Sequence, residues 1–248
     1  MNKKISTVVF DLYETIIFPK KGFKPAPLQA FINTFNYYLP DKSYDNKIFI
    51  DIVNKNMGHS KRKHLSLILE YPYLTEFNKY LTKNNITQNQ VYNKFIDVQC
   101  ELLENPDYCV LAGNYHKTIE ELQKIGIKNI CATTGFNYLQ TSIILHHNPN
   151  LKLGKIITTD NVKKPRPAPD GIHKIMDKYD IYDYNVVKIG DTIADIQEAH
   201  NAKVISIGIT TGSVLCEEFK ANNAEYVINN IDELPDLVKN INKIKIYF

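Results

Sequence analysis

Three carboxylates stand at or just after the ends of apolar segments. Asp11 follows the β-branched stretch 5–10, Asp191 ends the stretch 186–191, and Asp195 comes four residues later. If the two stretches are parallel strands, their carboxyl ends meet at one rim of a sheet, and Asp195 points the same way one helical turn on. Three oxygen ligands without His or Cys suit Mg²⁺. The set predicts a magnesium site, although each residue alone could be a helix cap or a turn residue.

Two further polar groups are expected at the same rim. The apolar stretch 127–133 ends in Thr133, which is followed by Thr134 and Gly135. A hydroxyl beside free backbone N–H groups can hold a phosphate oxygen, but a helix-capping threonine would give the same pattern. Arg166 lies between prolines in KKPRPAPDGI, which restricts where its guanidinium points. It could neutralise a phosphate or a carboxylate, and a solvated surface arginine is the alternative.

The elements that position these residues are short apolar runs separated by helical patterns. We expect buried parallel strands at 5–10, 127–133, 155–160, 186–191 and 203–209, with an edge strand at 224–228. Helical periodicity at 115–126 and 170–180 lies between them. This alternation predicts an α/β fold with a parallel sheet flanked by helices.

The interval from 20 to 107 differs from the rest of the chain. It has no convincing strand, and its apolar residues recur with a spacing of about 3.6, which is typical of helices. We therefore expect an all-helical cap (20–107) inserted after the first strand of an α/β core (1–19 and 108–248). An insertion at this point covers the carboxyl end of the sheet, where open α/β sheets bind ligands.

Composition narrows the class of protein. The 248 residues include 30 basic and 27 acidic side chains, so nucleic acid and membrane surfaces are not favoured as partners. The sequence contains no apolar run of 18 residues and no recognisable signal peptide. The four cysteines are far apart, without a CxxC pair, and are interpreted as reduced thiols. Together these features predict a soluble, cytoplasmic protein.

Four of these segments, taken in order, resemble the motifs of the haloacid dehalogenase superfamily. They are FDLYET (10–15), ATTG (132–135), RPAPD (166–170) and GDTIAD (190–195). The resemblance implies a Rossmann-like core, a Mg²⁺ cofactor, a small phosphorylated substrate, and Asp11 as the nucleophile that forms an aspartyl phosphate. Members of the superfamily usually carry a second Asp two residues later as a general acid, but this chain has Tyr13 there.

Within the superfamily the chain is most similar to the phosphonoacetaldehyde hydrolases (phosphonatases), which also lack the second Asp. The stretch NMGHSKRKHLSLILEYP resembles their cap motif, in which Met and Gly precede a Schiff-base Lys and a His. The resemblance implies that Lys61 forms the imine, that His64 takes part in catalysis and that Met57 contacts substrate. It also implies hydrolysis to acetaldehyde and phosphate, and a homodimer formed through the cap.

Carbon–phosphorus cleavage explains how the second carboxylate can be omitted. A carbanion is too basic to leave unaided, but an iminium on the adjacent carbon accepts the electrons, and a neutral enamine departs. The backbone carbonyl of Tyr13 could still reach the metal. Lys61 must be neutral to attack, and we expect burial and the nearby charges of Arg62, Lys63 and Lys55 to lower its pKa. His64, three residues later on the same helical face, could then shuttle protons.

Several features leave alternatives open. A solvated basic patch, KRKH, is the plain interpretation of residues 61–64. Tyr13 is larger than the small residue expected, Glu14 replaces a glycine, and Phe136 replaces a tyrosine in the threonine motif. The rival hypotheses are a phosphatase or phosphotransferase for a small metabolite, in which Lys61 only binds phosphate, and a catalytically impaired protein that keeps the fold for binding.

Overall fold

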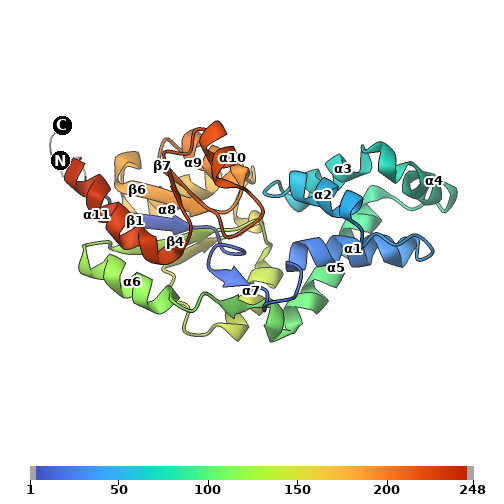
Figure 1. The fold of residues 1–248 in the computed structure, drawn as a ribbon, viewed down its shortest axis with the longest axis horizontal. Helices are drawn as coiled ribbons and strands as arrows, with labels where there is room; N and C mark the ends of the chain where they lie inside the picture. Colours follow the sequence, from blue (N-terminus) through green and yellow to red (C-terminus); the bar gives the residue numbers. More distant parts are fainter. Residues whose placement is uncertain (1–3, 245–248) are drawn as a thin grey trace.

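The computed structural model describes residues 4–244. Its centre is a six-stranded parallel sheet with the order β5-β4-β1-β6-β7-β8 (Figure 1). The strands are β1 (Thr7–Phe10), β4 (Asn129–Thr133), β5 (Lys155–Ile157), β6 (Val186–Gly190), β7 (Ile205–Ile209) and β8 (Tyr226–Ile228). The predicted parallel α/β fold is therefore confirmed, with each strand shorter than its apolar run.

Helices cover both faces of the sheet because its strands are apolar on both sides. In β1, Val8 and Phe10 pack in the cluster that includes α6 and α11, whereas Val9 faces the cluster of α8 and α9. The core helices are α6 (Tyr115–Lys124), α7 (Tyr138–His147), α8 (Asp170–Tyr179), α9 (Ile193–Asn201), α10 (Cys216–Ala221) and α11 (Leu234–Ile244). Short 3-10 turns occupy 72–74, 106–108, 159–161, 183–185 and 231–233.

The strand order decides which residues can meet at the rim of the sheet. β1 lies between β4 and β6, and Phe10 pairs with Ala132 on one side and Ile189 on the other. The next residue, Asp11, donates its backbone N–H to the Ile189 carbonyl at 2.7 Å. The segments that follow β4, β1 and β6 therefore emerge side by side, although they are distant in the sequence.

The helical insertion lies between two short strands that the sequence did not reveal. β2 (Ile17–Phe18) and β3 (Val110–Leu111) form an antiparallel pair, and five helices separate them (Figure 1). These are α1 (Ala26–Tyr38), α2 (Lys47–Lys55), α3 (Lys61–Leu69), α4 (Thr75–Lys83) and α5 (Gln88–Glu104). We call this insertion the cap; the domain boundaries at 19/20 and 107/108 stay a prediction.

The cap has its own hydrophobic core, in which five phenylalanines pack among mainly aliphatic side chains. Phe35 stacks on Phe77 with ring centroids 4.3 Å apart, and Phe31 packs at the same distance from Phe95. Helix α2, which the sequence analysis did not identify, contributes Phe49 to this cluster. Because its core is separate from the core beneath the sheet, the cap can act as one packed unit.

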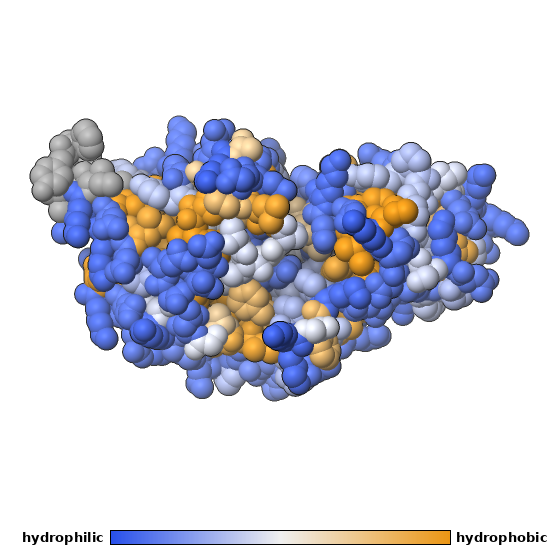
Figure 2. Space-filling model, viewed as in Figure 1, coloured by the Kyte–Doolittle hydropathy of each residue, from blue (hydrophilic) through white to orange (hydrophobic). Residues whose placement is uncertain are grey.

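The lengths of the helices and the hydropathy of the surface bear on membrane spans and on hydrophobic patches. No helix within residues 4–244 is long and apolar enough to cross a membrane. Figure 2 shows hydrophobic residues on one face as separate patches over the core and the cap, surrounded by hydrophilic side chains.

Candidate active site

The three predicted carboxylates come together at the rim of the sheet. Asp11 follows β1, Asp191 follows β6, and Asp195 lies in the first turn of α9. One oxygen of each lies within 4.8 Å of the others, and all three side chains are buried. This donor set has the size and chemistry of a site for a hard divalent cation.

The charges of these carboxylates are only partly compensated by the protein. Burial raises the pKa of Asp11, and the positive charge of Arg166 offsets only part of that rise. Burial and the neighbouring charges of Glu14 and Asp11 raise the pKa of Asp191 well above its usual range. Burial would also raise the pKa of Asp195, but Arg166 and Lys188 outweigh it and lower the pKa to about 2. A divalent cation would relieve the repulsion that remains at Asp11 and Asp191.

Arg166 reaches the rim as predicted. Its Nη1 lies 2.8 Å from Asp11 Oδ1 and also bonds to Asp195 Oδ1. The side chain is 10 % exposed and lines the cavity above the carboxylates. Its guanidinium is thus fixed between the candidate nucleophile and the cavity.

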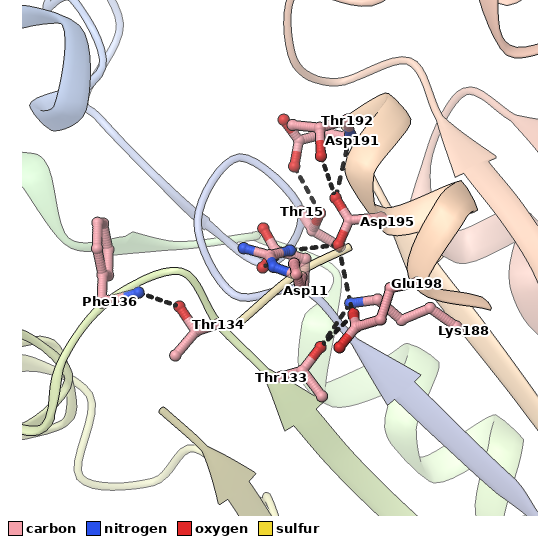
Figure 3. A network of polar contacts seen from close by, with 11 residues as sticks. Asp11, Thr15, Thr133, Thr134, Phe136, Lys188, Asp191, Thr192, Asp195 and Glu198 are labelled. Carbon is pink, nitrogen blue, oxygen red and sulfur yellow. Dashed lines mark hydrogen bonds and ion pairs between the residues drawn. The ribbon is translucent and has the colours of Figure 1, made fainter. Parts of the chain in front are cut away.

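A buried polar network, which was not expected from the sequence, contacts Asp195 on the side of β6 (Figure 3). Lys188, in the middle of β6, places Nζ 2.9 Å from Asp195 Oδ1 and 3.5 Å from Glu198 Oε2. It is 1 % exposed. The sequence did contain a sign of this network, a lysine inside the apolar run VVKIGD. A buried ammonium is tolerated only where carboxylates compensate its charge, so such a lysine implies acidic partners.

The two threonines after β4 have different environments. The Thr133 hydroxyl donates to Glu198 at 2.9 Å and accepts from Lys188 at 2.9 Å, so both of its functions are engaged. Thr134 Oγ1 accepts the Phe136 N–H at 3.3 Å and keeps its own proton available. A Cβ on Gly135 would lie 3.0 Å from Arg166 Nη2. These contacts favour Thr134 over Thr133 as the hydroxyl that could meet a phosphate oxygen.

A small cavity separates this rim from the cap. It has a volume of about 40 Å³, enough for a few water molecules. Both ionic and apolar side chains line it. The ionic ones include Asp11, Glu14, Lys61, Arg166 and Asp191, and the others include Tyr13, Pro27, Met57 and Phe136.

Lys61 enters the cavity from the cap. It is the first residue of α3, and Ser60 caps the helix by accepting the Lys63 N–H. Burial lowers the pKa of Lys61 to about 8; the positive charge of Arg166 adds to the decrease, and Asp11, among other carboxylates, opposes it. The expected source of like charge was wrong, because Arg62 points to Asn89 and packs on Tyr92.

The structure does not bring His64 into this cavity. The ring is buried in the cap, 4.5 Å from the Phe31 ring centroid, and Nε2 lies 2.9 Å from the Val53 carbonyl oxygen. A carbonyl only accepts, so Nε2 carries the proton, and Nδ1 is left without a partner. A catalytic role for His64 stays a prediction. His59, which the sequence analysis did not single out, lines the cavity instead.

The cap and the core touch at Gly58, beside the cavity. Its φ is +87°, and a Cβ there would lie 2.7 Å from both Ala194 Cβ and Thr192 Oγ1. Only glycine allows this approach. The cap is therefore seated on the amino end of α9, beside the cavity.

The loop after Asp11 accommodates the residues that depart from the family pattern. Glu14 has a φ of 65°, so it keeps the left-handed backbone that a glycine would adopt. Burial raises its pKa to about 7, while the positive charge of Lys61 opposes that rise. No hydrogen bond to the Tyr13 carbonyl is found within residues 4–244. That oxygen stays available as a fourth ligand at the candidate metal site.

Comparison with known proteins agrees with this architecture. Residues 28–209 match the family model described as haloacid dehalogenase-like hydrolase. A phosphonoacetaldehyde hydrolase of Parabacteroides distasonis is 31 % identical, covering 97 % of this chain and 98 % of that protein. One of Latilactobacillus sakei is 29 % identical, covering 94 % and 95 %.

Solved structures show the same fold at lower identity. A phosphonoacetaldehyde hydrolase like protein from Oleispira antarctica has a TM-score of 0.79 at 17 % identity, covering 96 % of this chain and 93 % of that one. A predicted phosphoglycolate phosphatase from Haemophilus somnus has a TM-score of 0.70 at 17 % identity, covering 96 % and 99 %. The chain belongs to the haloacid dehalogenase-like hydrolases.

Proposed function

We propose that this hydrolase cleaves the carbon–phosphorus bond of phosphonoacetaldehyde or a closely related aldehyde phosphonate. The observation that carries the proposal is a lysine of lowered pKa, Lys61, in the same cavity as the candidate nucleophile Asp11. The relatives named as phosphonoacetaldehyde hydrolases support it.

Lys61 supplies the reactive amine in the first step. Its neutral amine adds to the aldehyde carbon, and loss of one water gives the protonated imine. Its place at the amino end of α3 favours the neutral form further, because that end of a helix is positive. Apolar side chains that line the cavity, such as Met57, would lower the polarity around the imine.

Asp11 then attacks phosphorus while the C–P bond breaks. The electron pair of that bond moves into the iminium and yields an enamine, and phosphorus passes to the Asp11 carboxylate. Arg166 and Thr134 hold the phosphonate oxygens. One water hydrolyses the aspartyl phosphate and a second hydrolyses the reprotonated imine, so the overall reaction consumes one water and gives acetaldehyde and phosphate.

The candidate metal site fits Mg²⁺, because it offers only oxygen ligands at the place where a phosphonate dianion would lie. Asp11, Asp191, Asp195 and the Tyr13 carbonyl would hold the ion. When bound, it supplies positive charge that offsets the carboxylates and the phosphonate.

A phosphatase or phosphotransferase remains the second candidate, and one observation favours it. The Glu14 carboxyl lines the same cavity as Asp11, so it could protonate a leaving-group oxygen in place of the missing second Asp. Lys61 would then only bind phosphate. If the protein is catalytically impaired, it should catalyse neither reaction and should not bind Mg²⁺.

Trapping with borohydride separates these functions. The protein is incubated with phosphonoacetaldehyde, Mg²⁺ and borohydride, and the adduct is located by mass spectrometry. We expect a two-carbon adduct on Lys61 and acetaldehyde release that Lys61→Ala abolishes, while Lys63→Ala, an exposed neighbour, leaves both unchanged. Phosphate release from phosphomonoesters that survives Lys61→Ala would overturn the proposal in favour of a phosphatase.

Homodimer formation and a cytoplasmic location also remain proposals. Sedimentation analysis would test whether the protein is a homodimer.

A further inference from the structure

Tyr13 connects the candidate nucleophile to the two segments that join cap and core. Its side chain is 6 % exposed. The hydroxyl donates to the Tyr108 carbonyl at 3.0 Å and accepts the Ala26 N–H at 3.1 Å. Ala26 is the first residue of α1, the first helix of the cap, and Tyr108 lies where the chain returns to the core. One hydroxyl therefore contacts both connections at once.

These two connections, residues 19–25 and 105–109, are also bonded to each other, and we call them the hinge. The Lys20 N–H donates to the Asp107 carbonyl at 2.6 Å, and their side chains form an ion pair at 3.1 Å. The rings of Phe23 and Tyr108 pack edge to face at 5.2 Å. Any rotation of the cap must pass through this paired segment.

Within residues 4–244, the Ala26 N–H has no hydrogen-bond acceptor other than the Tyr13 hydroxyl. The first N–H groups of a helix lack intrahelical partners, and a capping side chain normally accepts from them. Here the N-cap residue is Pro25, which offers no such side chain, and no side-chain cap is made. The Tyr13 hydroxyl serves as the acceptor from outside the helix, at a position that is fully buried.

The ring of the same residue forms part of the reaction cavity. It packs edge to face on Phe136, with centroids 5.5 Å apart, and lies two residues after Asp11. Burial raises the pKa of the phenol well above its ordinary value, so the hydroxyl keeps its proton. Tyr13 is thus a rigid connection between the hinge, the cavity wall and the nucleophile loop.

We propose that Tyr13 is a positioning residue that couples cap closure to the nucleophile loop, an inference that rests on the proposed function of the cavity. Its hydroxyl holds the hinge in the form in which Lys61 faces Asp11 and Gly58 meets α9. The large side chain that departs from the family pattern is accommodated because its polar end is directed into the hinge.

The test compares Tyr13→Phe with Tyr138→Phe, a matched control whose side chain is 71 % exposed. Hydrogen exchange of the Ala26 amide and of residues 57–60 is followed without substrate. We expect both to exchange about tenfold faster in Tyr13→Phe, as one lost hydrogen bond would give, and to be unchanged in the control. Unchanged exchange at residues 57–60 would overturn the coupling, whether or not the protein proves to be a phosphonatase.

The reaction provides a second readout. With phosphonoacetaldehyde, we expect kcat/KM of Tyr13→Phe to fall about tenfold, because fewer molecules are closed. Borohydride trapping at saturating aldehyde should still modify Lys61. A fall in activity without faster exchange at residues 57–60 would mean that the hydroxyl acts in the chemistry and not in closure. Absence of activity in the unmodified protein would refute the proposed function but leave the exchange result intact.

Discussion

Lys61 should react with aldehydes as an amine whose pKa is about 8, and not 10.5. At pH 7.5 such an amine is about one-quarter neutral, compared with about one part in a thousand for an ordinary lysine, so imine formation should be about 200-fold faster. Below pH 8 the rate should fall about tenfold per pH unit, and above pH 8 it should level off. Burial is the main cause, because the ammonium loses its hydration.

The structure also predicts in which direction the pKa of Lys61 should change in the variant Glu14→Gln. The Glu14 carboxylate raises the pKa of Lys61, so its removal should lower the midpoint. The assay measures borohydride trapping of acetaldehyde on Lys61 from pH 6 to 10, which requires no C–P chemistry. Lys63→Ala is the control. A midpoint near 10.5, or an upward shift in Glu14→Gln, would refute this account of the site.

Three further changes test the closed form, the buried network and the metal site. Gly58→Ala should lower kcat/KM about 100-fold, because its Cβ would lie 2.7 Å from Ala194 Cβ, and urea unfolding should show a loss of only about 1 kcal/mol. Lys188→Met should lower the free energy of unfolding by about 3–5 kcal/mol in urea titrations, because Asp195 loses a buried partner. Asp191→Asn should weaken Mg²⁺ binding at least about tenfold by calorimetry, without destabilising the metal-free protein, because it removes a repelled charge.

Much of the fold was predictable because apolar periodicity reports burial directly. The parallel strands followed from continuous apolar runs, and most cap helices followed from a spacing near 3.6. The pair β2 and β3 was not predictable, because two residues carry no period. Helix α2 was missed, although its buried residues Phe49, Ile52 and Val53 have the spacing of one helical face.

The site was predictable where strand ends or flanking prolines restrict the direction of a side chain, as at Asp11, Asp191 and Arg166. Asp11 and Asp191 converge because β1 and β6 are neighbours, and this follows from the topology of the fold. Lys188 was missed because its partners, Asp195 and Glu198, come from the next helix, and their approach depends on side-chain conformations that periodicity does not encode. His64 shows the converse case. Its spacing from Lys61 is correct for one helical face, but the packing of the cap directs it inward.

The placement of the reactive groups on two bodies has a chemical consequence. Asp11 belongs to the core and Lys61 to the cap, and each body has a separate hydrophobic cluster. We therefore expect the lowered pKa of Lys61 to depend on the contact of the two surfaces at Gly58. An open cap would return the amine to water and to its protonated form. In the proposed reaction, closure would thus supply the nucleophilic amine as well as the cavity, and a residue that held the hinge would affect both.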